Sequence, residues 1–127
     1  MLKKLYLFAA LSWTSIIFFL CLIKSSEIPV INIVNLDKLV HAFFHFVFTI
    51  LWFLYCKKQF KNVHSNEPLV FVFVLSVIYG IAIEIAQLLF TTTRSADVLD
   101  VVANMLGAIA GVSVIALVSK LRFGKTT

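Results

Sequence analysis

A chain of 127 residues that is 61% hydrophobic and only 13% charged lacks the polar surface of a soluble globular domain, in which about 25% of residues are charged. Its length suits one domain with about four membrane spans of roughly 20 residues each. The net charge of +5 lies at the ends of apolar segments, and no nucleic-acid-binding motif accompanies it. We therefore expect a membrane protein with no nucleic-acid partner.

The apolar residues form four successive segments. The first follows Lys3 and Lys4 like a signal peptide, but its apolar run exceeds the usual core of about 7–15 residues. No A-x-A cleavage site follows it, so we expect this segment to be retained. Pro68 opens the third segment, with Ser65 or Asn66 as the cap. The predicted membrane-spanning helices are 5–23, 36–56, 68–90 and 98–121.

The basic residues indicate how these helices are oriented. Eight of the 11 Lys and Arg residues fall on the side that holds both termini and the loop between the second and third spans. The positive-inside rule assigns that side to the cytoplasm. We therefore expect an all-α integral membrane bundle of four transmembrane helices, with residues 1–127 as a single domain, both termini cytoplasmic, and membrane lipids as its surroundings.

Polar residues gather where the second, third and fourth spans reach the outer face. Asp37, His41 and His45 are spaced four apart, so they share one face of the second span. The rest of this group lies beside them or on the other two spans and the turn between: Lys38, Glu84, Gln87, Arg94, Asp97, Asp100 and Asn104. Charged groups inside a membrane are costly and usually functional. We expect a wet pocket that opens to the extracytoplasmic side.

Simpler explanations exist for several of these residues. Asp37 and Asp97 could serve only the first turns of their helices. Lys38 could extend its ammonium group to the lipid headgroups. Gln87 and Asn104 could link helices by hydrogen bonds, and His45 could be a packed histidine. Glu84 and Asp100 could pair with Arg94, and the G-x-x-x-G pattern at Gly107 and Gly111 is most simply a helix-packing face.

The charges in this group do not balance. Four carboxylates stand against two fixed cations, namely Asp37, Glu84, Asp97 and Asp100 against Lys38 and Arg94. Two uncompensated negative charges in a medium of low dielectric require a protonated carboxyl group, a charged histidine or a bound cation. Perturbed titration of this kind is typical of functional sites.

The strings D-K-L-V-H, E-I-A-Q and R-S-A-D-V-L-D-V-V-A-N-M-L-G-A resemble the VanZ-like family of small bacterial membrane proteins over residues 36–111. The resemblance implies a place in the bacterial cytoplasmic membrane and a role at the cell envelope, because the namesake is associated with resistance to the glycopeptide teicoplanin. The chain departs from the family where Phe and Tyr are frequent, since Ala42 and His45 stand there. It also has Thr91-Thr92-Thr93 where the family often has Pro or Gly.

These observations favour an envelope protein whose pocket binds or processes an anionic lipid-linked or peptide ligand. Lys38 and Arg94 would hold the anionic group. Four further residues are candidate ligand contacts: Asp37, Gln87, Asp97 and Asn104. His41 would carry a proton, and Glu84 and Asp100 would orient it or act as the base, which makes these three the catalytic candidates.

Two alternatives remain open. His41, Glu84 and Asp100 could bind a metal in a membrane hydrolase or transferase, although the chain has no compact motif such as H-E-x-x-H. The polar residues could instead only lock together a structural or partner-binding bundle. The sequence identifies neither a cofactor nor an oligomeric state, and it leaves open whether the protein is an enzyme.

Overall fold

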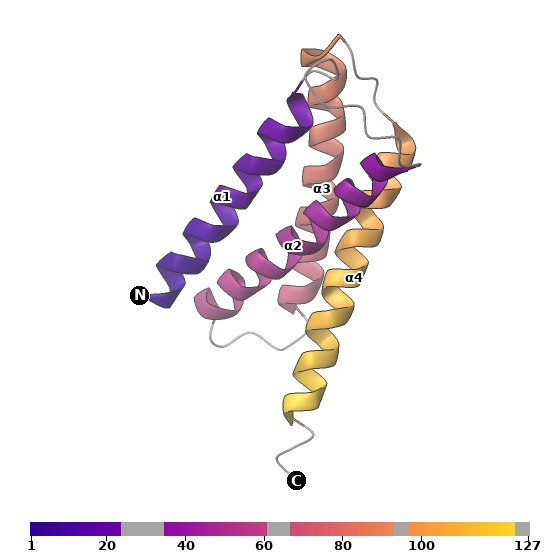
Figure 1. The fold of residues 1–127 in the computed structure, drawn as a ribbon. Coiled ribbons are helices and arrows are strands. Elements are labelled where there is room, and N and C mark those ends of the chain that lie inside the picture. The colour runs from indigo at the N-terminus through magenta and orange to yellow at the C-terminus, as the bar shows by residue number, and fades with distance from the viewer. Residues whose placement is uncertain (24–34, 61–66, 93–96, 124–127) are drawn as a thin grey trace.

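A computed structural model describes residues 1–23, 35–60, 67–92 and 97–123. These residues form four α-helices and no strand: α1 (Leu2–Leu22), α2 (Leu36–Gln59), α3 (Glu67–Phe90) and α4 (Val98–Phe123) (Figure 1). All four helices are long and apolar enough to cross a membrane. The prediction of an all-α bundle with four candidate spans is confirmed.

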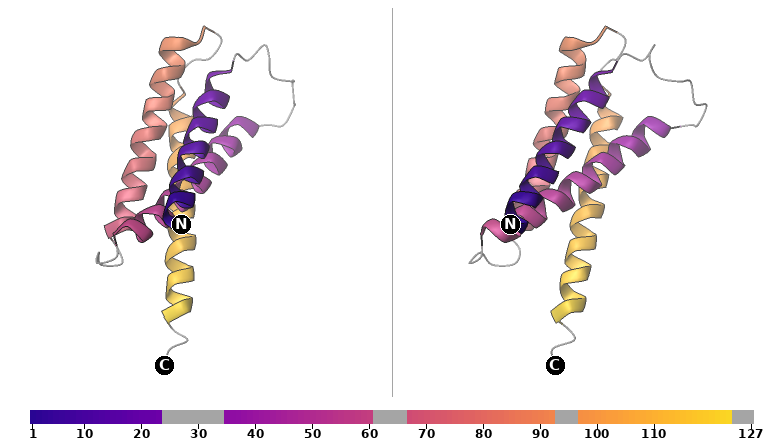
Figure 2. Two further views of the ribbon diagram at one scale, coloured as in Figure 1. Left: turned by 90° about the vertical axis from the view of Figure 1, so that its left-hand side faces the viewer. Right: turned by 60° about the vertical axis from the view of Figure 1, so that its left-hand side comes forward.

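The helices run alternately in opposite directions. The start of α1 and the end of α4 lie at one end of the molecule, and the starts of α2 and α4 lie toward the other (Figure 1). The last turns of α4 extend beyond the other helices (Figure 2). This arrangement places the helix ends as the predicted topology requires. The assignment of the end that holds both termini to the cytoplasm stays a prediction.

The outer surface of the bundle is apolar. Large hydrophobic side chains are exposed on each helix, among them Phe19, Phe43, Leu88 and Leu106. A water-soluble protein rarely exposes contiguous apolar surface on this scale. The exposed surface therefore suits contact with lipid.

The residues at the starts of α2, α3 and α4 differ in how they begin their helices. Asp97 precedes α4, and its Oδ1 accepts a hydrogen bond from the backbone N–H of Leu99 at 2.8 Å, which caps the helix. Asn35 precedes α2 in the left-handed conformation, with φ of 60°, which Asn tolerates better than most residues. Pro68 lies in the first turn of α3 as predicted, and the proposed caps Ser65 and Asn66 lie outside the described residues.

Helix α2 is the centre of the bundle, since it packs against the other three helices and most extensively against α4. Gly107 permits this close approach, because a Cβ atom there would collide with the backbone carbonyl group of Ala42. A Cβ atom at Gly111 would lie 3.0 Å from the Cβ of Thr49. The predicted role of the G-x-x-x-G pattern as a packing face is confirmed.

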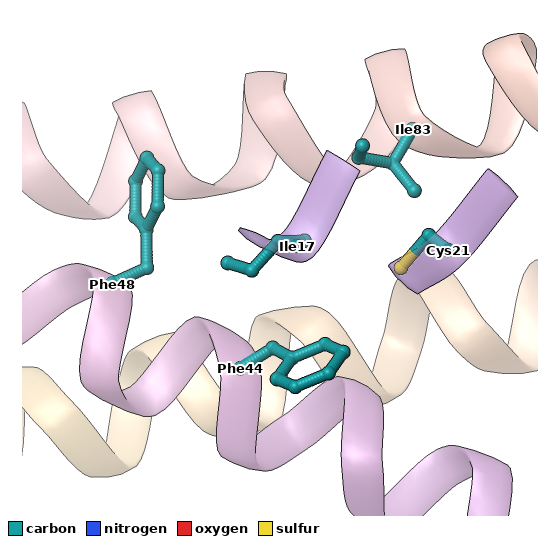
Figure 3. Close-up of a cluster of buried hydrophobic side chains, with 5 residues drawn as sticks. All are labelled: Ile17, Cys21, Phe44, Phe48 and Ile83. Atoms are coloured by element: carbon teal, nitrogen blue, oxygen red, sulfur yellow. The ribbon is translucent and has the colours of Figure 1, made fainter. Parts of the chain in front are cut away.

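Helix α1 is held against α2 and α3 by apolar and polar contacts. The buried apolar cluster that joins the three helices consists of Ile17, Cys21, Phe44, Phe48 and Ile83 (Figure 3). Trp13 Nε1 donates a hydrogen bond to the carbonyl oxygen of Phe44 at 3.0 Å. Tyr79 Oη donates to the carbonyl oxygen of Thr14 at 2.6 Å. Helix α1 therefore forms a supporting wall on one side of α2 and α3.

Candidate functional site

Polar side chains from α2, α3 and α4 converge toward the end of the bundle where α2 and α4 begin. The enclosed members of this polar cluster are His41, Glu84, Asp100 and Asn104, and their exposed fractions lie between 1% and 8%. They reach one another because each stands within two turns of the helix end at which its span meets this face. The convergence predicted from the spacing of these residues is present in the structure.

The outer part of the cluster is an ionic group centred on Lys38. Its Nζ lies 3.1 Å from Asp37 Oδ2, 3.1 Å from Asp97 Oδ2 and 3.3 Å from Asp100 Oδ1. The Asp37 and Asp97 side chains are 55% and 40% exposed, whereas that of Asp100 is 12% exposed. Lys38 therefore links the start of α2 to the start of α4. Its ammonium group does more than extend toward the lipid headgroups, which was the simpler interpretation of this residue.

Asp97 serves both the ionic group and the helix cap. The hydrogen bond from the Leu99 N–H, together with the one from Lys38 Nζ, holds the pKa of the Asp97 carboxyl below its usual range. Asp37 differs, since its carboxylate accepts a hydrogen bond from Lys38 although it lies in the first turn of α2. The capping interpretation thus holds for Asp97.

His41 occupies the middle of the polar cluster. Its Nδ1 donates a hydrogen bond to Asn104 Oδ1 at 3.1 Å, because an amide oxygen can only accept. The neutral ring therefore carries its proton on Nδ1 and keeps a lone pair on Nε2. His41 Nε2 lies 3.8 Å from Asp100 Oδ2. The ring atom that remains available to take up a proton or bind an electrophile is Nε2.

Glu84 enters the cluster from α3. Its Oε2 accepts a hydrogen bond from the backbone N–H of Asp97 at 3.1 Å. Its Oε1 is buried and has no hydrogen-bond partner in the described part of the chain. One potential ligand atom each from Glu84, His41 and Asp100 lies within 4.8 Å of the other two. These three side chains could therefore hold a metal ion.

A second polar layer lies deeper in the bundle. His45 Nδ1 and Ser76 Oγ are 2.8 Å apart, and both residues are buried. Gly80 makes room between the layers, since a Cβ atom there would lie 2.9 Å from Asn104 Nδ2 and 3.2 Å from His45 Cε1. The sequence reasoning missed Ser76, although its spacing of four from Gly80 and eight from Glu84 places it on the same helix face.

Gln87 and Arg94 complete the set of candidates. Gln87 Nε2 donates a hydrogen bond to the carbonyl oxygen of Cys21 in α1 at 2.9 Å. This contact favours the interpretation that Gln87 links two helices. Arg94 lies outside the described residues.

The predicted pocket at the polar cluster stays a prediction. Two grooves among the described residues lie nearer the opposite end of the bundle, where they are lined by residues such as Cys56, Phe60 and Ile115.

The comparison with protein families covers nearly the whole chain. Residues 3–119 match the family model described as VanZ/LLP1. No curated protein and no solved structure matches the chain significantly. The matched region includes α1, whereas the resemblance seen in the sequence was limited to residues 36–111.

Proposed function

Because this chain belongs to the VanZ/LLP1 family and has four helices that can span a membrane, we propose that it is a cell-envelope protein whose polar cluster binds or processes an anionic ligand at the extracytoplasmic face. The observation that supports this proposal most directly is the burial of His41, Glu84, Asp100 and Asn104 against one another. Ionisable groups inside a membrane bundle are costly, and they are retained chiefly where they act.

The proposed roles follow from which atoms are already engaged. His41 acts through Nε2, because its Nδ1 is committed to Asn104. Asp100 Oδ2 lies 3.8 Å from that nitrogen, and Glu84 has a carboxylate oxygen within 4.8 Å of a potential ligand atom of His41 and of Asp100. This geometry suits proton transfer or the binding of an electrophile at Nε2.

The ligand is proposed to approach from the exposed end of the polar cluster. Asp37, Lys38 and Asp97 are the described residues there that retain exposure. Arg94 precedes α4 in the sequence, and its planar guanidinium suits a phosphate or carboxylate. A lipid-linked or peptide component of the envelope carries such groups, and the family resemblance supports the proposed link to teicoplanin resistance.

The proposal is tested by measuring teicoplanin susceptibility in a susceptible bacterium that expresses the chain. We expect the wild type to raise the inhibitory concentration, and His41→Ala, Glu84→Gln, Asp100→Asn and Arg94→Ala to return it to that of the empty vector. Glu67→Gln is the matched control, because Glu67 is exposed at the opposite end of the helix that carries Glu84.

Two results would count against the proposal. A wild type without effect on susceptibility removes the link to glycopeptides. Variants that are inserted normally and keep the full effect, but unfold at lower temperature, favour the structural-bundle alternative instead.

Orientation has its own test. In a background without Cys21 and Cys56, Asn35→Cys should react with a membrane-impermeant maleimide added to intact cells. Lys58→Cys, at the other end of α2, should react only after the membrane is permeabilised. The reverse pattern would place the polar cluster at the cytoplasmic face.

A further inference from the structure

We propose that His41, Glu84 and Asp100 together bind one divalent transition-metal ion, such as Zn²⁺ or Mn²⁺, between α2, α3 and α4. This inference rests on the proposed function and deepens it, because the ion would be the group that receives the anionic ligand. Three observations support it: the hydrogen bonds that already engage these side chains, the spacing of their potential ligand atoms, and the net charge of the cluster.

The first observation is that, within the described part of the chain, each of the three side chains has one polar atom in a hydrogen bond and one outside any hydrogen bond. His41 Nδ1 donates to Asn104, which leaves Nε2. Glu84 Oε2 accepts from the Asp97 N–H, which leaves Oε1. Asp100 Oδ1 accepts from Lys38 Nζ, which leaves Oδ2. Metal ligands are typically oriented in this way, with the second polar atom of each held by a neighbouring group.

Glu84 Oε1 is the atom that most directly indicates a ligand. Glu84 is 4% exposed, and this oxygen has no hydrogen-bond partner among the described residues. A buried carboxylate oxygen without a partner carries a desolvation penalty that folding normally avoids. A cation bound at this position would satisfy Oε1 and the two atoms left over on His41 and Asp100 at the same time.

The second observation is the distance between the candidate ligand atoms. His41 Nε2 and Asp100 Oδ2 are 3.8 Å apart, and one potential ligand atom from each of His41, Glu84 and Asp100 lies within 4.8 Å of the other two. Ligands bound at about 2.1 Å from one ion lie roughly 3–4 Å from each other. A small inward movement of three side chains would therefore complete the site. One imidazole with two carboxylates suits zinc or manganese better than calcium or copper(I).

The third observation is the net charge of the polar cluster, its outer ionic group included. Lys38 is already bound to three carboxylates, so its charge is not free for an anionic ligand. Even when Arg94 is counted, the four carboxylates leave two negative charges, which one divalent ion balances. A bound metal ion would thus remove the net repulsion of anions and offer an anionic ligand a coordination position on the ion.

The test is metal binding by the purified full-length chain in detergent or nanodiscs, with an affinity tag that contains no histidine. After treatment with a chelator, Zn²⁺ and Mn²⁺ are titrated separately by calorimetry, and bound metal is measured by elemental analysis. We expect one equivalent per chain. Glu84→Gln, Asp100→Asn and His41→Ala should each weaken binding at least about 100-fold, and Asn104→Ala about 10-fold or more, because it orients His41.

The control variant is Glu67→Gln, which should bind metal as the wild type does. The inference is overturned if the wild type binds neither ion, or if Glu84→Gln and Asp100→Asn leave the affinity unchanged. If a substituted chain fails to fold, the wild-type stoichiometry and its thermal stabilisation by metal still decide the matter. A wild type without bound metal would leave protonated carboxyl groups or a charged histidine as the explanation of the charges.

The two proposals fail in different ways. If the polar-cluster variants abolish the effect on teicoplanin susceptibility but the wild type binds no metal, the metal site is wrong and the proposed function stands. If the wild type binds one metal ion but the same variants keep full resistance, the metal site stands and the proposed function is wrong.

Discussion

His41 Nδ1 donates a hydrogen bond to Asn104 Oδ1 at 3.1 Å, across the contact between α2 and α4 and between residues 63 positions apart. Both side chains are almost fully buried. This bond sets which ring nitrogen of His41 carries the proton, and so it directs the other nitrogen toward Asp100. The chemistry of the polar cluster therefore depends on how closely two helices approach.

Asn104→Ala should lower both stability and function. The substitution leaves the His41 N–H buried without its acceptor, which costs about 1–3 kcal/mol in the free energy of unfolding. The measurement is thermal or denaturant unfolding in detergent, together with teicoplanin susceptibility. Ser113→Ala on the exposed side of α4 is the control. Equal stability of Asn104→Ala and the wild type would show that the bond contributes nothing.

Ser76→Ala should lower the stability of the bundle without affecting the function of the polar cluster. It removes the hydrogen-bond partner of buried His45, and we expect a loss of about 1–3 kcal/mol in stability. Because Ser76 lies below the cluster and contacts none of its proposed metal ligands in the hydrogen bonds described, susceptibility to teicoplanin should not change in cells that contain equal amounts of protein. A complete loss of resistance at normal protein levels would extend the functional site to the deeper layer.

Gly107→Ala and Gly111→Ala should differ in severity. A Cβ atom at Gly107 collides with the backbone of Ala42, which cannot move without shifting α2, so we expect a loss of about 1–3 kcal/mol. At Gly111 the nearest atom lies 3.0 Å away, and the better helix propensity of Ala, worth about 0.5–1 kcal/mol, offsets part of the cost. Unfolding of the two variants in the same detergent checks the order. The opposite order would contradict the packing described for α2 and α4.

Lys38→Gln should lower the unfolding temperature at neutral pH. The substitution leaves Asp37, Asp97 and Asp100 facing one another without the ammonium group that holds them together. The matched control is Lys58→Gln, because Lys58 is exposed at the other end of the same helix. If both variants melt with the wild type, the ionic group makes no net contribution to stability, as is common for exposed ion pairs.

Much of the site could be predicted from helix periodicity alone. Asp37, His41 and His45 repeat every four residues, and Asp97, Asp100 and Asn104 follow a similar stripe. Residues on one stripe share a face, and polar faces inside a membrane turn toward one another rather than toward lipid. The convergence of His41, Glu84, Asp100 and Asn104 is the direct result.

The individual partners could not be predicted in this way. Gln87 and Glu84 share one face of α3, yet Gln87 binds the backbone of α1 while Glu84 enters the polar cluster. Periodicity gives the direction of a side chain only to within a wide arc, and the neighbouring helix decides what it meets. The resemblance to a family did not reach α1, so a contact with Cys21 was not expected.

The sequence by itself determined that this is a membrane bundle of four helices with its polar residues at one face, because hydrophobicity and spacing are local properties that act within each helix. Only the tertiary structure decided that Lys38 is shared by three carboxylates, that His41 is oriented by Asn104, and that Glu84 keeps one oxygen without a partner among the described residues. These contacts depend on how helices far apart in the chain are packed against each other, and that packing is set by close approaches such as that of Gly107 to Ala42.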